Sequence, residues 1–242
     1  MLEKLELFAE LEESARRAIG RLSRASMRRV RKHSILIREG DPVSSAFFLL
    51  EGWAVRYEYL ADGRRQITAI LLPGDVFNLN AYLFKKADDS IMAISDVTVG
   101  EMSRRHFEEL TSAHPTTAKS FLWCQLVELA VEREWVVNLG RRTSTERICH
   151  IFCELYLRLN SVVALDGDGF LLPLTQNDLA DATGMTSVHV NRVLRQLRRS
   201  GSISFRHRHL QIEDFGSLQK LAGFDPSYLH LDRWLSDAKG QD

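Results

Sequence analysis

The sequence predicts an α+β protein with an N-terminal antiparallel β-sandwich or jelly roll, one long helix, and a C-terminal pair of short helices followed by a hairpin. Three observations support this prediction. Turn residues recur every 11 or 12 residues in the first third of the chain, the apolar period becomes helical after Pro115, and a tight turn separates two helical segments after Leu174. The 242 residues suffice for two ordinary domains.

The composition is that of a globular protein with no overall charge. Hydrophobic residues make up 45% and charged residues 26% of the chain, and Lys plus Arg and Asp plus Glu each total 32, so any basic site must be local. The three cysteines argue against a secreted disulfide framework. No signal peptide and no run of 18 apolar residues is visible, so we expect a cytoplasmic protein that does not enter a membrane.

The first third of the chain reads as short strands between turns. In one expected strand, Trp53, Val55, Tyr57 and Tyr59 alternate with smaller or polar residues, which predicts a half-buried strand. The turns contain Gly40, Gly52, Gly63 and Gly74. The expected strands are residues 35–37, 47–50, 53–60, 66–72, 91–94 and 97–102.

A long amphipathic helix is predicted from Pro115 to about Gly140, with a length of about 38 Å at 1.5 Å per residue. Its apolar stripe, which Arg133 interrupts, fits two structures: a helix that packs on its own domain and a helix that pairs with a second chain. The stripe consists of Leu122, Leu126, Leu129 and Val136. A polar joint and another helix over residues 145–159 should follow.

Two short helices joined by a tight turn are predicted over residues 174–200. Thr175 and Asp178 have the spacing of a capping box, Gly184 lies at the turn, and Thr186 or Ser187 can cap the second helix. The inner stripe of that helix is Val190, Val193, Leu194 and Leu197. Residues 202–205 and 210–212 read as the two arms of a hairpin.

This C-terminal region carries a local basic charge. Between Thr186 and Leu210 there are six arginines, three histidines and no acidic residue. The arginine fork binds phosphate and reads guanine in the major groove, so double-stranded DNA is the expected partner. The expected DNA-binding residues are Thr175, Thr186, Ser187, Val188, His189, Asn191, Arg192, Arg195, Arg206 and Arg208.

On three stretches the sequence resembles the Crp/Fnr family of bacterial transcription regulators: Gly-Asp-Val-Phe at residues 74–77, residues 147–159, and above all residues 174–195. The resemblance implies a cyclic-nucleotide-binding-like β-roll over residues 1–114, a dimerisation helix over 115–140, a winged helix-turn-helix over 141–213 and an extension over 214–242. It also implies that Arg192 reads a guanine in each half-site. Val188 and Asn191 stand where the family often has glutamate and serine, which leaves the other base preferences open.

The predicted effector pocket departs from the cyclic-AMP-binding members of the family. The resemblance implies that those members have Gly-Glu-Leu, followed by Arg-Ser, at the pocket. This chain has Asn78-Leu79-Asn80 and Asp89-Ser90 at the corresponding positions. An acid at the phosphate position repels the ligand, and Leu79 cannot accept a hydrogen bond from a ribose, so cyclic AMP is not expected. No cysteine precedes Cys124, so the iron–sulfur cluster of the family's oxygen sensors is not expected either. We expect no cofactor, and the effector is unknown.

Two patterns contain residue types that bind metals. Cys149 and Cys153 supply only half of a zinc site and read better as buried apolar residues. His207 and His209 are similar to a metal-binding strand of cupin-type enzymes, so the alternative function is a cupin-like metalloenzyme with an accessory basic domain. The preferred prediction is a homodimeric, sequence-specific transcription regulator that binds a palindromic operator, has RNA polymerase as a further partner, holds no metal and is not an enzyme.

Overall fold

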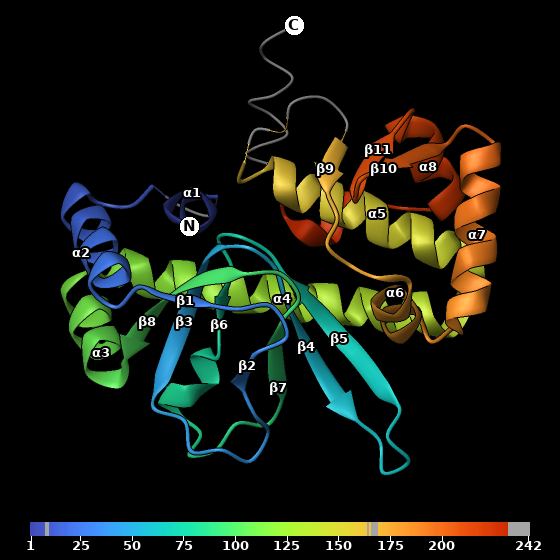
Figure 1. The fold of residues 1–242 in the computed structure, drawn as a ribbon. Coiled ribbons are helices and arrows are strands. Elements are labelled where there is room, and N and C mark those ends of the chain that lie inside the picture. The colour runs from blue at the N-terminus through green and yellow to red at the C-terminus, as the bar shows by residue number, and fades with distance from the viewer. Residues whose placement is uncertain (8–9, 164, 166–168, 232–242) are drawn as a thin grey trace, which may run out of the picture. The chain divides into compact units, whose positions relative to one another are not determined.

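A computed structural model describes residues 1–7, 10–163, 165 and 169–231 (Figure 1). Residues 232–242 of the predicted extension therefore lie outside the described residues. The chain forms two compact units. The first holds residues 1–58 and 69–129, and the second holds residues 59–68 and 130–230.

Two four-stranded sheets with the orders β1-β8-β3-β6 and β2-β7-β4-β5 lie in the first unit, except that the tip of the β4–β5 hairpin, residues 59–68, belongs to the second unit. The strands are β1 (Arg28–Val30), β2 (Ile35–Ile37), β3 (Ser45–Glu51), β4 (Ala54–Tyr59), β5 (Arg65–Leu71), β6 (Val76–Phe77), β7 (Ser90–Ala93) and β8 (Val97–Ser103). Three helices and a 3-10 turn accompany them: α1 (Leu2–Glu6), α2 (Glu13–Ala25), α3 (Arg104–Ala113) and η1 (Leu79–Tyr82). The pairings of β3 with β8 and of β4 with β7 are antiparallel, as expected for a sandwich.

Strand β3 supplies side chains to two separate parts of the core. Phe48 belongs to the cluster that also contains Ile19 of α2 and Leu110 of α3. Leu49, which points to the other face of the strand, packs with Phe77 and Ile91. Both faces of the strand are therefore buried, which explains its nearly continuous apolar sequence.

All six predicted strands are present, with ends that differ from the prediction by at most two residues. Two further strands, β1 and β6, were not predicted: β1 begins with two arginines, and β6 has only two residues. Trp53, Val55 and Tyr57 are buried as expected, but the alternation is wrong at both ends of the strand, where Ala54 is 0% and Tyr59 63% exposed. Tyr59 is the last residue of β4, where the chain turns into the hairpin and leaves the core.

The long helix α4 runs from Pro115 to Arg141. It passes Gly140, where we expected it to end. The next helix, α5 (Ser144–Asn160), begins with a capping box in which Thr143 and Glu146 each bond the other's backbone N–H. This cap, rather than the glycine, sets the end of α4, because Thr143 is extended and cannot continue the helix. The predicted second helix is thus confirmed.

The second unit contains the predicted pair of short helices and the hairpin. Its elements after α5 are β9 (Gly169–Leu171), α6 (Gln176–Thr183), α7 (Ser187–Arg199), β10 (Ile203–Arg206), β11 (His209–Ile212), α8 (Phe215–Ala222) and η2 (Pro226–Leu229). Strand β9 pairs with β11 and makes the hairpin a three-stranded sheet, which the sequence did not predict.

Residues 214–230 also belong to the core of this unit, although we expected only an extension there. Glu154 of α5 is 1% exposed. Its carboxylate accepts hydrogen bonds from Trp135 Nε1 at 3.0 Å and from the Tyr228 hydroxyl at 2.9 Å. Because these bonds satisfy a buried carboxylate, they attach η2 firmly to α4 and α5. Among the described residues, no helix is both long and apolar enough to span a membrane.

Candidate DNA-binding site

The helix pair α6–α7 is fixed by local capping. The Thr175 side chain accepts from the Asp178 N–H at 3.1 Å, and Asp178 accepts from the Thr175 N–H at 2.9 Å. Gly184 ends α6 with a φ of 64°, a left-handed conformation that favours glycine. Thr186 caps α7 by accepting from the His189 N–H at 3.2 Å. The capping box, the turn and the Thr186 cap are therefore confirmed.

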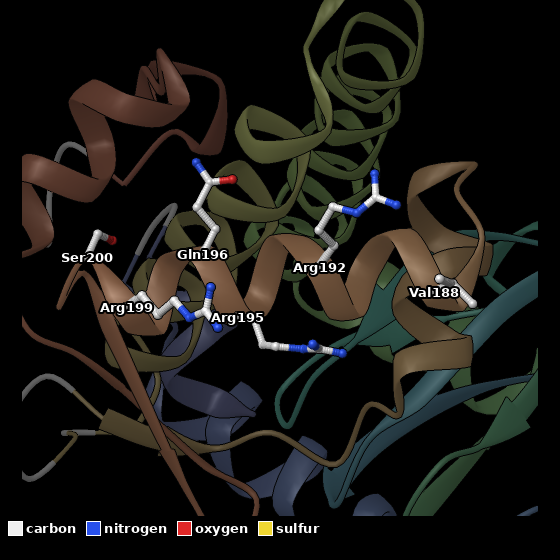
Figure 2. Close-up of a pocket in the computed structure, with 6 residues that line it drawn as sticks. All are labelled: Val188, Arg192, Arg195, Gln196, Arg199 and Ser200. Atoms are coloured by element: carbon white, nitrogen blue, oxygen red, sulfur yellow. The ribbon is translucent and has the colours of Figure 1, made fainter.

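Helix α7 divides into a buried and an exposed face. The four residues of the predicted inner stripe, Val190, Val193, Leu194 and Leu197, are all buried. The opposite face carries an open groove, and Figure 2 shows the side chains that line it. The groove is lined by Val188, Arg192, Arg195, Gln196, Arg199 and Ser200. A face built from arginines, an amide and one apolar side chain can bind phosphate and contact base edges.

Three polar side chains form a chain of hydrogen bonds across the two helices. Gln176 of α6 accepts from Asn191 Nδ2 at 3.0 Å, and Asn191 Oδ1 accepts from Arg195 Nε at 2.8 Å. Both ends of the Asn191 amide are thereby engaged by protein groups. Gln176 was not among the predicted site residues, since one polar residue in the first turn of a short helix gives no signal by itself.

The hairpin β10–β11 presents further cations. Its register pairs Ile203 with Ile212 and Arg206 with His209, so His207 and Arg208 alone form the turn. Both turn residues have positive φ, 50° and 65°. Such two-residue turns with left-handed backbone match the twist of a hairpin. Arg206 and Arg208 are exposed, and His209 lies opposite Leu171 of β9.

Two arginines that the sequence did not single out hold α6 in place. Arg147 of α5 donates to the Thr183 carbonyl at the end of α6, at 2.9 Å. Arg65 donates to Asp178 at 2.6 Å and to Asp181 at 2.7 Å. Burial alone would raise the pKa of Asp178, but its bonds from Thr175 and Arg65 hold that pKa below its usual value. The carboxylate therefore stays charged and keeps the cap of α6 formed.

The long helix α4 exposes the stripe that the sequence indicated. Leu122, Leu126, Leu129 and Val136 are 60%, 55%, 46% and 70% exposed. Trp135 and Val131 on the same helix are buried, so α4 packs on its own units through a different set of residues. Of the two interpretations of the stripe, packing within the chain is therefore the one that the structure does not support. A row of exposed apolar side chains of this kind is typical of an interaction surface.

The predicted effector-pocket residues all have partners within the first unit. Asn78 is buried and donates to the Ser45 carbonyl at 2.7 Å, while Leu79, 9% exposed, begins the turn η1. Asn80 donates to Asp88 at 2.6 Å, which joins the two pocket segments. Ser90 accepts from the Glu39 N–H at 3.0 Å.

The fifth pocket residue, Asp89, forms an ion pair with Arg56 of β4. Arg56 also donates to Glu128 of α4 at 2.6 Å. Burial raises the pKa of Asp89, although Arg56 opposes this effect. The cation of this region is thus held between two carboxylates of the chain itself.

The cysteine and histidine cluster of α5 lies in the core. Cys149, His150 and Cys153 are all 0% exposed. Burial raises the pKa of the Cys149 thiol to about 12 and raises that of Cys153 as well, so both are unreactive thiols at neutral pH. Burial lowers the pKa of His150 to about 3. These properties are those of core residues.

Comparison with known proteins agrees with this architecture. A family model for the cyclic nucleotide-binding domain matches residues 27–114, and one for the Crp-like helix-turn-helix domain matches residues 146–221. The chain is 31% identical over 194 residues to the transcriptional activator protein FnrL of Cereibacter sphaeroides, covering 78% of this chain and 77% of FnrL. It is 32% identical over 186 residues to the nitrogen fixation regulation protein FixK of Bradyrhizobium diazoefficiens, covering 76% of each.

A solved structure is similar as well. FixK2 from Bradyrhizobium japonicum superposes with a TM-score of 0.72 at 28% identity, covering 82% of this chain and 98% of FixK2. The fold of the chain, its basic helix pair α6–α7 and its similarity to these regulators together define a DNA-binding transcription regulator. The chain belongs to the Crp/Fnr family.

Proposed function

We propose that this regulator binds a palindromic operator as a homodimer, with α7 in the major groove and the hairpin β10–β11 as a wing on the backbone. The observation that supports this most strongly is charge. The six arginines of α7 and the wing are all exposed, and the segment from Thr186 to Leu210 contains no acid in a chain of zero net charge. Such a local basic face on a helix pair is what a DNA reader requires.

The exposed residues of α7 have separate roles in this proposal. Arg192 reads guanine O6 and N7 through its fork. Val188, 71% exposed, lies near the start of the helix and contacts a thymine methyl group, as apolar side chains do in the major groove. Ser187 and His189, beside the helix N-terminus, bind phosphate together with the backbone N–H groups there.

Arg195 is the next residue of α7 that contacts DNA in this proposal. Its guanidinium is oriented by Asn191 through the 2.8 Å bond to Nε, and its two terminal nitrogens are left for a phosphate or a base edge. Arg206 and Arg208 on the wing bind the backbone without reading sequence. Thr175 and Thr186 act through the caps that they form rather than by touching a base.

The exposed α4 stripe is the dimer surface in this proposal. A two-fold dimer places its recognition helices about 34 Å apart, one turn of the duplex, so each half-site meets an identical helix. In this proposal the β-roll of residues 1–114 is the sensor domain. Residues 115–140 form the dimerisation helix, and residues 141–213 form the DNA-binding domain. RNA polymerase is the further partner of such a cytoplasmic regulator, and regulation rather than catalysis is its role.

Selection of bound duplexes from a random pool tests the proposal directly. The purified full-length chain is incubated with random double-stranded DNA, and the bound fraction is amplified and sequenced. We expect an inverted repeat with a guanine at the same place in each half-site. Recovery of sequences without two-fold symmetry, or no enrichment over the input pool, would contradict it.

A further inference from the structure

The six arginines between Thr186 and Leu210 are not all held alike. Among the described residues, only Arg195 of these six has a side-chain hydrogen bond or ion pair: its Nε donates to Asn191 Oδ1 at 2.8 Å. The other five are Arg192, Arg198, Arg199, Arg206 and Arg208. Binding a phosphate requires positive charge rather than one fixed orientation, so the bond on Arg195 needs another explanation.

Asn191 is itself held by a residue of the other helix. Its Nδ2 donates to Gln176 Oε1 at 3.0 Å. Gln176 is the first residue of α6 and directly follows the cap that Thr175 forms with Asp178, so its backbone is fixed. This acceptor on α6 decides which end of the Asn191 amide faces Arg195. If the amide turned over, its NH2 group would face the Nε–H of Arg195, and two donors cannot bond.

The bond to Nε leaves one edge of the Arg195 guanidinium free. That edge carries Nη1 and Nη2, whose parallel N–H groups match O6 and N7 of one guanine. Arg195 is exposed, and no carboxylate of the described residues pairs with it. Because the group is oriented before it binds, less conformational freedom is lost when it contacts a base. The arrangement is therefore that of a group prepared for one specific contact.

Arg195 also extends towards the part of α7 where bases are read. Figure 2 shows its side chain lying along the helix towards the end that carries Val188. In helix-turn-helix proteins the N-terminal residues of the recognition helix contact base edges. Arg192 lines the same groove. The two arginines are three residues apart, about 4.5 Å along the helix axis, which is close to the rise of about 3.4 Å between base pairs. They are therefore spaced to contact neighbouring base pairs.

We propose that Arg195 reads a second guanine in each half-site, within about two base pairs of the guanine that Arg192 reads. Gln176 is the positioning residue that orients Arg195 through Asn191. This inference rests on the proposed function, because it requires that α7 enters the major groove. It follows that a residue of α6 that touches no base changes the base preference of α7.

Selection of bound duplexes from a random pool is repeated with variants of the full-length chain. Arg195→Ala removes the reading group, Gln176→Met removes the acceptor and keeps helix propensity, and Gln176→Glu keeps an acceptor. The controls Asn177→Met and Asn177→Glu make the same changes at the next exposed position of α6. Because a carboxylate near DNA weakens binding to every sequence, base preferences rather than affinities are compared. Thermal unfolding confirms that each variant is folded.

For wild type we expect two guanine positions in each half-site. Arg195→Ala and Gln176→Met should lose the preference at one of them and keep the preference at the position of Arg192, which is the internal control. Gln176→Glu and both Asn177 variants should keep both guanines. When the second guanine is replaced by adenine, wild type should bind at least about fivefold more weakly, and Gln176→Met should differ by less than about twofold.

A wild type that selects one guanine per half-site would overturn the proposal. So would an Arg195→Ala protein that selects the same two guanines with lower affinity, because Arg195 would then contact phosphate. An unchanged base preference in Gln176→Met, or its loss in Gln176→Glu but not in Asn177→Glu, would show that the acceptor does not orient Arg195. Failure of the proposed function gives a different result, because the wild type itself then enriches no sequence with two-fold symmetry.

Discussion

Asn191 Oδ1 accepts a hydrogen bond of 2.8 Å from Nε of Arg195, one turn further along α7. The other end of the same amide donates to Gln176 on α6. An asparagine that reads adenine uses both its amide oxygen and its amide nitrogen on the base. Each amide atom keeps one further hydrogen-bonding position, but the two bonds fix the orientation of the side chain, so we expect Asn191 to act on the operator mainly by positioning Arg195.

Replacement of Asn191 by alanine should therefore act through Arg195. We expect Asn191→Ala to weaken operator binding by about 1 kcal/mol, since a charge-assisted bond that orients the guanidinium is lost. In a double-mutant cycle, Asn191→Ala should have little further effect once Arg195 is alanine. Fluorescence anisotropy with the selected operator measures all four affinities, and additive losses would show that Asn191 contacts DNA independently.

The exposed stripe of α4 predicts how the chain assembles. Leu126→Asp places a charge in the centre of the proposed dimer surface, where burying it without a partner is strongly unfavourable. We expect a monomer by analytical ultracentrifugation and a loss of operator affinity. Ser112→Asp adds the same charge at an exposed position of α3 and should leave the dimer intact. A Leu126→Asp protein that keeps the mass of a dimer would place the interface elsewhere.

His150 predicts a specific loss of stability in mild acid. Its ring is 0% exposed, stacks on Tyr228 and faces Glu134 and Arg142, and burial lowers its pKa from 6.5 to about 3. Below pH 6.5 the unfolded chain binds a proton there that the native chain does not. Stability from this group is thus fully present above pH 6.5 and is lost as the pH falls towards 3.

Urea unfolding at pH 7 and pH 5 checks this effect against His150→Phe, which keeps an aromatic ring and cannot titrate. The free energy of unfolding of wild type, relative to the variant, should fall by about 2 kcal/mol between the two pH values. A difference that does not change with pH would mean that the buried ring takes up its proton near the usual pKa.

The partners of Asp89 and Arg56 predict that cyclic nucleotides do not bind in the usual way. Arg56, the cation of that ion-pair cluster, is held by Asp89 and Glu128, so a phosphate that binds Arg56 would have to displace a carboxylate. Calorimetric titration with millimolar cyclic AMP or cyclic GMP should give no saturable heat, and operator affinity should not change with either ligand. Micromolar binding that is lost in Lys85→Gln/Lys86→Gln would show that the loop of residues 83–88 forms a different anion site.

Local signals made much of this protein predictable. Thr175, Gly184 and Thr186 determine the ends of α6 and α7 through caps and one left-handed residue, and the sequence shows each of them. The strands β6 and β9 depend instead on pairing with β3 and β11, distant in sequence. The bond between Tyr228 and Glu154 and the contact of Arg147 with Thr183 likewise join residues far apart. Local sequence patterns do not predict such contacts, because their stability comes from tertiary packing.

The binding of Arg192→Ala to operator and to random DNA tests sequence-specific recognition most directly. Arg192 lines the exposed groove of α7, where a base contact gives specificity (Figure 2). We expect this variant to lose about 1 to 3 kcal/mol on the selected operator and to keep its affinity for random duplex. Arg206→Ala, the matched control on the wing, should weaken both alike and lower the salt slope by about one unit. Equal losses of Arg192→Ala on both DNAs would contradict recognition of the operator through this residue.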